Sequence, residues 1–327
     1  MKQDDSPSEP RPPYEVSGNS FLSYLPTSWV PYAQLMRLDK PGGYFAFVFP
    51  YWIGLSYGAS IALHPPTPGF LLTRAGLFSV ACIFLRGAAC TWNDNIDQDY
   101  DRLVARCQNR PIARGAISTT AGHVFTALQT VMGSTAFFLL PDICMADAIP
   151  ITLLFAIYPF GKRFTDYPQA ILGFPFAFGI VLACHSIQVD PFATRPAGLL
   201  WSTTALVVAN VLWTMIYDTI YAHQDREDDR KAGVKSMAVR FRDSTKLLCS
   251  ALSAIIVSLL VGVGVFAQLH WIYYVVGVGG VAISLITMIT AVELAVPESC
   301  MWWFQWGFWY VGGSLLGGFL LQYSRLS

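Results

Sequence analysis

The chain has 327 residues, of which 54% are hydrophobic and 13% charged, and its mean hydropathy is +0.45. A soluble domain usually carries about 25% charged residues, so this composition excludes an ordinary soluble enzyme and a disordered chain. The 21 basic residues balance the 21 acidic residues, which argues against nucleic-acid binding through bulk charge. The composition therefore predicts a polytopic membrane protein.

The first 40 residues are polar and rich in proline, and they precede the first long apolar run. We expect residues 1–40 to form a flexible polar tail and residues 41–327 to form one transmembrane domain. Acidic residues at positions 4, 5, 9 and 15 make a poor mitochondrial leader, because such leaders are rich in arginine and poor in acids. No cleavable secretory signal is expected, so the first apolar run is expected to direct membrane insertion.

The rest of the chain contains repeated apolar runs that are long enough to cross a bilayer, which takes about 20 residues of helix. The runs are continuously apolar and do not alternate, which favours helices over a membrane β-barrel. We predict an all-α bundle of about nine transmembrane helices around a central cavity, with eight as the alternative count. The predicted spans are 44–63, 70–92, 119–140, 143–160, 169–188, 197–217, 247–267, 271–292 and 302–321.

Basic residues are distributed unevenly between the two sides of this arrangement. The side that carries the amino terminus holds 17 of the 21 lysines and arginines. Loops rich in lysine and arginine stay in the cytoplasm. The loops after predicted spans 2, 4, 6 and 8 are therefore expected in the cytoplasm or its topological equivalent.

The end of the second predicted span carries several aspartates. On a helix that turns by about 100° per residue, Asp94, Asp97 and Asp101 share an arc of about 60°, whereas Asp99 points elsewhere. Three carboxylates on one face repel each other unless cations neutralise them, and Mg²⁺ prefers such hard oxygen ligands. This cluster is a candidate metal site, with a solvated helix end as the alternative.

A second acidic cluster follows the sixth predicted span. Asp218, Asp225 and Asp229 share an arc of about 40° on a helix. Four spans separate the clusters, so both lie on the same side of the membrane and could face each other. Carboxylates at the edge of a bilayer are costly and indicate function. The pair of clusters predicts a site for two or more Mg²⁺ ions around a diphosphate.

Basic residues lie near both clusters. Lys162 and Arg163 end the fourth span, where they would reach a diphosphate held between the clusters. Arg86 lies within the second span, where an arginine must find a partner, and we expect aspartates one or two turns later to provide it. Most other loop arginines, including Arg106, are explained as well by membrane orientation and contact with lipid phosphates.

The stretch NDNIDQDYD at 93–101 resembles the NDxxDxxxD motif of the UbiA superfamily of intramembrane prenyltransferases, and DTIYAHQD at 218–225 is similar to its second motif. Further matching segments are RLDKP at 37–41, NRPIARG at 109–115, YPFGKR at 158–163 and GVKS at 233–236. The resemblance covers about residues 32–240 and is strongest to the branch that includes 4-hydroxybenzoate polyprenyltransferase. Met237 departs from the threonine that is usual in the ubiquinone enzymes.

The resemblance implies an electrophilic aromatic substitution, in which an electron-rich ring attacks C1 of an allylic diphosphate inside a dry cavity. It implies Mg²⁺ ligands among Asn93, Asp94, Asp97, Asp101, Asp218, Asp225 and Asp229. It implies catalytic roles for the aspartates at 94, 97, 101, 218 and 225, for Lys162 and Arg163 as neutralising charges, and for Tyr221 as a cation-stabilising ring. Contacts with the substrates are expected from Asn93, Arg37, Lys40, Arg86, Arg110, Tyr158 and Lys235.

The short acidic leader and Met237 favour the fungal relatives of this branch, which transfer farnesyl or geranylgeranyl groups to polyketide-derived phenolic acids or pyrones in meroterpenoid biosynthesis. Arg37 and Lys40 would then face an acceptor carboxylate. An endomembrane of the endoplasmic-reticulum type is expected, rather than the mitochondrial inner membrane. No nucleic acid and no obligate protein partner are expected.

Three alternatives remain from the sequence. The first is the 4-hydroxybenzoate polyprenyltransferase of ubiquinone biosynthesis. The second, a CDP-alcohol phosphotransferase, is disfavoured because its Asp-Gly pattern is missing at Asp101-Arg102. The third, a cation carrier, is disfavoured because the acids lie at helix ends rather than in mid-membrane. The sequence leaves the acceptor, the prenyl length and the alkylated ring position open.

Overall fold

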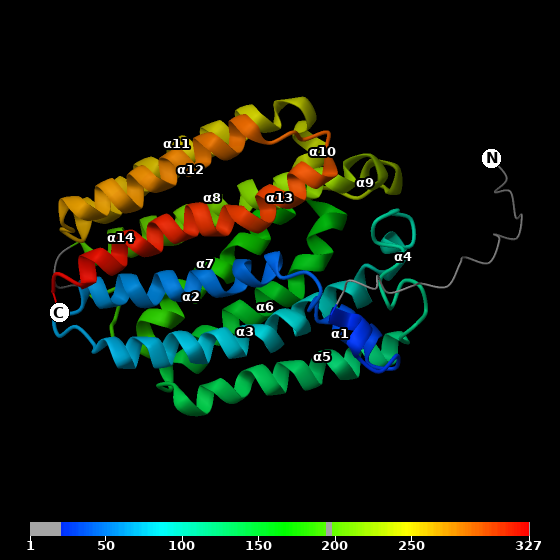
Figure 1. Cartoon of the computed structure of the whole chain (residues 1–327), viewed down its shortest axis with the longest axis horizontal. Coiled ribbons are helices and arrows are strands. Elements are labelled where there is room, and N and C mark those ends of the chain that lie inside the picture. Colours follow the sequence, from blue (N-terminus) through cyan, green and yellow to red (C-terminus); the bar gives the residue numbers. More distant parts are fainter. Residues whose placement is uncertain (1–20, 194–197, 327) are drawn as a thin grey trace, which may run out of the picture.

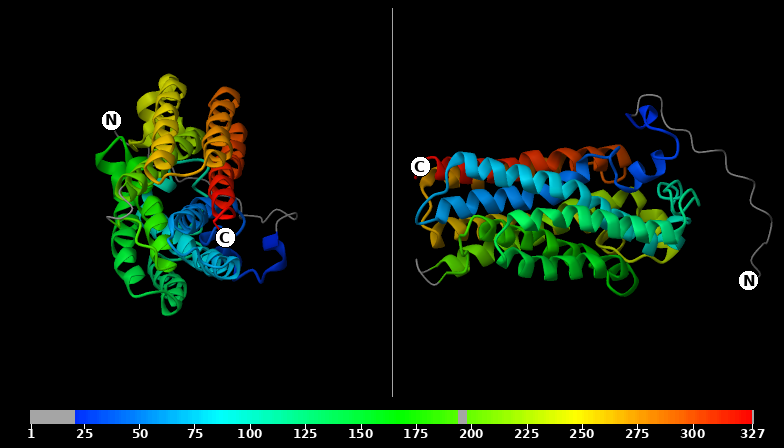
Figure 2. Two further views of the ribbon diagram at one scale, coloured as in Figure 1. Left: turned by 90° about the vertical axis from the view of Figure 1, so that its left-hand side faces the viewer. Right: turned by 90° about the horizontal axis from the view of Figure 1, so that it is seen from below.

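The computed structural model describes residues 21–193 and 198–326, and within these ranges it contains helices and no β-strand (Figure 1). The prediction of an all-α fold is confirmed. Long helices lie roughly parallel, and the view along the bundle shows them nearly end-on (Figure 2).

Six helical stretches in the described ranges are long and apolar enough to cross a membrane, and each coincides with a predicted span. They are built from α3 (Pro68–Ile96), α6 (Ile143–Phe164), α7 (Pro168–Ser186), α8 (Leu199–Ala222), α11 (Thr245–Phe266), and η5 (Tyr273–Gly279) with α12 (Gly280–Ala291). The short segments η3 (His223–Asp225) and α9 (Arg226–Ala232) continue α8, and α10 (Met237–Phe241) and η4 (Arg242–Ser244) precede α11.

The other three predicted spans also fall on helices, but these do not reach the length or the hydropathy of a clear span, so the count of nine stays a prediction. They are α2 (Gly42–Ile61), α5 (Thr119–Ser134) with η2 (Thr135–Leu139), and α13 (Pro297–Gly307) continuing through η6 (Phe308–Gly312) into α14 (Gly313–Tyr323).

Helix α7 lies at the centre of the bundle, where it packs against α2, α6 and α8. In its most apolar window 72% of the residues are buried, against 17% in that of α6, so α6 presents its apolar surface outward. Polar contacts also join the central helices, since the Tyr57 hydroxyl on α2 lies 2.9 Å from both Ser202 Oγ and Thr203 Oγ1 on α8. This packing and these hydrogen bonds hold α2, α7 and α8 in fixed positions relative to one another.

Short helices gather at the end of the bundle away from the carboxyl terminus (Figure 1). They are α1 (Val30–Leu35), α4 (Gln98–Asp101), α9 and α10, and η1 (Phe21–Tyr24) precedes α1. The prediction of a flexible tail does not hold for residues 21–35, because η1 and α1 form there and Leu35 is buried with Ile112 and Ile117. Residues 1–20 of the predicted tail lie outside the described residues.

Candidate active site

A cavity of about 270 Å³ opens at this end of the bundle, between the ends of α2, α3, α6, α7, α8 and α13. Aspartates from both acidic clusters line it, namely Asp94, Asp97, Asp101, Asp218, Asp225 and Asp229. The two clusters, which lie on different helices, thus share one cavity, as their placement on one side of the membrane predicts.

The first cluster forms where α3 ends. The helix continues to Ile96, and Asp97 ends it with φ −94° and ψ 5°, while its amide still donates to the Asn93 carbonyl at 2.9 Å. The chain then turns directly into α4, which carries Asp101. Asp94, Asp97 and Asp101 are each at most 5% exposed, whereas Asp99 is exposed and pairs with Arg102 at 2.8 Å. The face expected from helical spacing is therefore the buried one.

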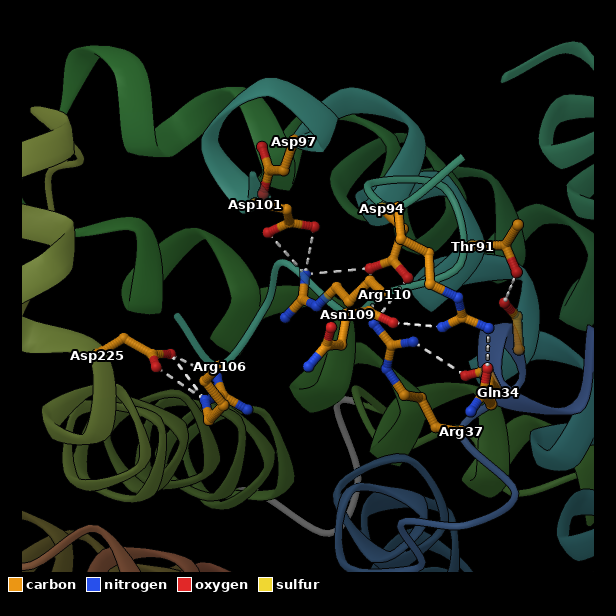
Figure 3. Close-up of polar contacts among 12 residues, drawn as sticks. Gln34, Arg37, Thr91, Asp94, Asp97, Asp101, Arg106, Asn109, Arg110 and Asp225 are labelled. Carbon is orange, nitrogen blue, oxygen red and sulfur yellow. Dashed lines mark hydrogen bonds and ion pairs between the residues drawn. The ribbon is translucent and has the colours of Figure 1, made fainter. Parts of the chain in front are cut away.

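Two arginines bind the first cluster (Figure 3). Arg37 Nη2 donates to both oxygens of Asp94, at 2.6 and 2.8 Å. Arg110 Nη1 donates to Asp94 at 3.1 Å and to the two oxygens of Asp101 at 3.0 and 2.8 Å. The buried carboxylates are compensated by these guanidinium groups, since an unpaired charge in a low-dielectric interior is costly.

Arg86 lies within α3 and is 6% exposed. Its guanidinium donates to two backbone carbonyls, those of Arg37 at 3.0 Å and Lys40 at 2.6 Å. The expectation that aspartates further along α3 would pair with it is wrong, because the α1–α2 loop lies closer. A Cβ on Gly43 would lie 3.0 Å from Arg86 Nη2, so a glycine there leaves room for the guanidinium. Arg86 thus holds the loop from which Arg37 reaches Asp94.

The backbone of Arg37 has a positive φ of 56°. Residues with a Cβ rarely adopt this left-handed conformation, and the surroundings must hold it in place. The hydrogen bond from Arg86 to the carbonyl of Arg37 is one such restraint.

The two basic residues at the end of α6 lie in different places. Lys162 lines the cavity, and its Nζ donates to Asp97 at 2.7 Å. Tyr158 lies one turn earlier and also lines the cavity. Arg163 is exposed and does not line the cavity, because its guanidinium donates to the Ile96 carbonyl at the end of α3, at 2.9 Å. Arg163 therefore caps a helix, and Lys162 faces the acids.

Lys235 also lies outside the cavity lining, although it was expected to contact substrate. Its side chain is exposed, and its backbone amide donates to the carbonyl of Lys162 at 3.0 Å. The contribution of this motif to the site comes from its neighbours Val234 and Ser236, which line the cavity.

Arg106 joins the loop after the first cluster to the second cluster. Its Nε lies 2.8 and 3.1 Å from the two oxygens of Asp225. Its Nη1 donates to the Tyr221 hydroxyl at 2.8 Å, and the guanidinium lies 4.9 Å from the centre of the Tyr221 ring. No local feature of the sequence distinguishes this arginine from the other loop arginines, because its partner lies 119 residues away.

Several oxygens of the predicted metal set have no partner. Asn93 Oδ1 and Asp97 Oδ1 are buried and accept no hydrogen bond, and among the ion pairs of residues 21–193 and 198–326 none involves Asp218 or Asp229. Within residues 21–193 and 198–326, no three acidic, histidine or cysteine side chains lie close enough together to hold a metal ion. The donors are hard oxygens, which fit Mg²⁺.

The cavity has aromatic walls below the charged groups. They are formed by Phe47, Phe155, Tyr158, Phe176, Tyr217, Tyr221 and Phe304. The rings of Tyr221 and Phe304 lie 4.4 Å apart, and Phe47 stacks on Phe155 at 5.2 Å. Except for Tyr158 and Tyr221, the sequence did not single these residues out, since aromatic residues also line lipid and helix interfaces.

Burial changes the acidity of two groups at the mouth of the cavity. It raises the pKa of Asp101, and the nearby Arg110 opposes that rise. It lowers the pKa of Lys40, which lines the cavity, and the charge of Arg37 lowers it further. Desolvation disfavours the charged form in both cases.

Comparison with known proteins identifies the family. Residues 47–313 match the UbiA prenyltransferase family. The prenyltransferase ascA of Acremonium egyptiacum is 40% identical over 97% of this chain and 92% of its own. The prenyltransferase stbC of Stachybotrys bisbyi is 35% identical over 92% and 90%, and the DMOA farnesyltransferase nvfB of Aspergillus novofumigatus is 40% identical over 79% and 80%.

Solved structures agree on the fold. A UbiA homologue from Aeropyrum pernix K1 has a TM-score of 0.66 at 23% identity and covers 84% of this chain and 97% of its own. A UbiA homologue from Archaeoglobus fulgidus, bound to GPP and Mg²⁺, has a TM-score of 0.64 at 20% identity and covers 90% and 99%. The chain belongs to the UbiA prenyltransferase family, and it is an integral membrane prenyltransferase.

Proposed function

We propose that the protein is a Mg²⁺-dependent aromatic prenyltransferase, which moves a farnesyl group from its diphosphate to a ring carbon of a polyketide-derived phenolic acid or pyrone. The observation that carries the proposal is the single cavity whose mouth is lined by both acidic clusters and whose deeper walls are aromatic. A diphosphate fits the charged mouth, and a prenyl chain and an aromatic ring fit the walls.

The charge balance of the cavity supports a requirement for divalent metal. Six aspartates line the cavity, and so do six basic residues, namely Arg37, Lys40, Arg86, Arg106, Arg110 and Lys162. The lining is therefore close to neutral, so a prenyl diphosphate would bring uncompensated negative charge into a partly buried site. Mg²⁺ bound by Asp218, Asp229 and the free oxygens of Asn93 and Asp97 would compensate that charge. The Mg²⁺-bound relative from Archaeoglobus fulgidus is consistent with this.

The reaction begins when the bond between C1 and the diphosphate oxygen breaks and the diphosphate takes the electron pair. Bound Mg²⁺ would supply Lewis-acid stabilisation of that leaving group. Lys162 and Arg110 line the same cavity, and their positive charges would neutralise the negative charge that develops on the diphosphate.

The allylic cation that remains needs a dry, electron-rich surrounding. The rings of Tyr221 and Phe304 line the cavity beside Asp225, and such faces attract cations. Arg106 fixes the Tyr221 hydroxyl and so orients its ring. A carbon of the acceptor ring then bonds to C1, and the released diphosphate or an aspartate of the cavity takes the ring proton, which restores aromaticity.

Two observations bear on the substrates. One relative at 40% identity is named a farnesyltransferase, which supports a C15 donor. Lys40 lines the cavity and, among the residues that the structure describes, takes part in no ion pair. A carboxylate on the acceptor would pair with it, whereas Arg37 is already bound to Asp94.

We propose that the protein lies in an endomembrane. Its motif loops would lie on the cytoplasmic side, which the distribution of basic residues favours.

The test is an assay on membranes that contain the protein. Farnesyl, geranylgeranyl and longer diphosphates are each offered with Mg²⁺ and either an orsellinate-type acid or 4-hydroxybenzoate. We expect C-prenylation of the orsellinate-type acid by a C15 or C20 donor, loss of product in Asp94→Ala and Asp225→Ala, and retention in Asp99→Ala, whose side chain is exposed. Prenylation of 4-hydroxybenzoate by long donors would identify the ubiquinone enzyme instead.

A further inference from the structure

A second, smaller void lies deeper in the bundle than the cavity. It has a volume of about 20 Å³, roughly the space of one water molecule. Its lining residues come from α2, α8, α11, α12 and the carboxyl-terminal helices, and they are Ile53, Leu206, Ala209, Asn210, Trp213, Ile256, Leu260, Val281, Val311, Gly312 and Leu315. Among the residues that the structure describes, none lines both spaces.

The two spaces follow one another along the same helices. On α8, Tyr217 lines the cavity and Trp213 lines the void, one helical turn away. On the carboxyl-terminal helices, Phe304 lines the cavity and Val311 lines the void. The wall between them is therefore one to two helical turns thick.

That wall is aromatic and closely packed, and Phe308 is at its centre. The Phe308 ring lies 4.7 Å from the ring of Tyr217, 6.2 Å from that of Trp213 and 6.5 Å from that of Phe49. All four side chains are buried, with exposures between 2% and 7%. We call these four residues the aromatic layer.

The backbone supports this packing. Phe308 begins the π-helical turn η6, which ends at Gly312. A Cβ on Gly312 would lie 2.7 Å from Phe49 Cδ1, so only a glycine lets Phe49 approach so closely. The layer is therefore held from two sides and will not yield easily to a longer ligand, because well-packed interiors resist added volume.

A donor bound by the acids would point its chain at this layer. Asp225 follows α8 eight residues after Tyr217, about 12 Å along a helix. With the diphosphate near Asp225, the far isoprene units of an extended chain would reach Tyr217 and Phe308. We propose that the aromatic layer is the stop for the distal end of the prenyl chain, and that Phe308 sets the longest donor that the enzyme accepts. This inference rests on the proposed function.

The test compares donor lengths in Phe308→Ala and in the milder Phe308→Leu, which keeps more of the packing. Phe319→Ala is the matched control, because Phe319 is fully buried, stacks on Tyr273 at 4.9 Å and lines neither space. Purified protein in nanodiscs is titrated, with Mg²⁺, against unreactive C10, C15, C20 and C30 thiolodiphosphates, so the readout needs no acceptor. Folding of each variant is checked by its thermal unfolding transition.

We expect the wild type to bind the C15 analogue more tightly than the C20 and C30 analogues. Phe308→Ala would join the void to the cavity and raise the affinity for C20 relative to C15 by about tenfold or more, with a smaller rise in Phe308→Leu and none in Phe319→Ala. An unchanged ratio in folded Phe308 variants, or equal binding of all lengths by the wild type, would overturn the inference alone. Failure of the wild type to bind any analogue would overturn the proposed function and this inference with it.

Discussion

Arg106 and Asp225 are 119 residues apart in the chain, and the guanidinium of one binds both carboxylate oxygens of the other. A second contact lies beside it, since the Ala105 amide donates to Asp228 at 3.2 Å. Together they join the loop after the first acidic motif to the end of the second. The two motifs are therefore coupled, and a substitution in one should affect the other.

Removing this ion pair should slow the reaction. We expect Arg106→Ala to lower kcat/KM by about 10²-fold, because Asp225, whose side chain is 10% exposed, loses its partner and Tyr221 loses its donor. Arg106→Ala combined with Asp225→Ala should cost less than the sum of the two single changes in free energy, as coupled residues do. Initial rates of the two single variants and the double variant measure this, and strict additivity would show that the pair does not act as one.

The dependence of the rate on Mg²⁺ should be set mainly by the cavity acids that have no basic partner. Chelation of divalent ions should abolish activity and added Mg²⁺ should restore it. Asp218→Ala should raise the Mg²⁺ concentration needed for half-maximal rate by roughly tenfold or more, because Asp218 lines the cavity. Asp99→Ala serves as the control, since Asp99 is exposed and pairs with Arg102. The same Mg²⁺ dependence in both variants would argue against Asp218 as a ligand.

Arg86 should matter for stability and activity together. Arg86→Ala leaves the carbonyls of Arg37 and Lys40 without their donor and should lower the free energy of unfolding by about 3 kcal/mol. Arg86→Ala should also lower the specific activity with the prenyl diphosphate, because Arg37 is no longer held toward Asp94.

The comparison is Arg74→Ala. Arg74 lies on the same helix at the opposite end, where it donates to the Leu139 carbonyl. We expect that variant to lose stability but to keep its activity per folded molecule. Unfolding in bicelles and specific activity are measured for both variants, and full activity in folded Arg86→Ala would contradict the positioning role.

The pH profile should respond to Arg110. Burial raises the pKa of Asp101, and Arg110 opposes this rise. Arg110→Gln removes the opposing charge, so the pKa of Asp101 should rise further and the acid limb of kcat/KM should move to higher pH. Arg102→Gln, which changes the exposed pair with Asp99 and hydrogen bonds to Ala113 and Gln98, outside the cavity lining, should leave the limb in place. A limb that moves to lower pH in Arg110→Gln would refute the assignment of Asp101 to it.

The parts of the fold that depend on local sequence were predictable. Apolar runs gave the helices because a membrane helix satisfies its own backbone and needs only apolar side chains. The buried face of Asp94, Asp97 and Asp101 followed from helical spacing, and it persists although Asp97 breaks the helix. The family resemblance then supplied the reaction class.

Contacts between distant segments were not predictable in this way. Arg37 and Asp94 are 57 residues apart, and the sequence around either residue does not indicate its partner. Arg86 was expected to bind a carboxylate, but backbone carbonyls of a loop satisfied it, and loop carbonyls carry no signal in the sequence. Residues such as Phe308 look like lipid-facing aromatic residues until neighbouring helices are in place.

The buried guanidinium of Arg86 also bears on how the protein is assembled. A charged side chain in the middle of a hydrophobic segment is expensive to insert into a bilayer. Its two acceptors, the carbonyls of Arg37 and Lys40, precede it in the chain, so they leave the ribosome before α3 does. Translation from the amino terminus thus provides the partner before the charge arrives, and a version of the chain that begins after residue 40 would have to insert α3 with its arginine unsatisfied.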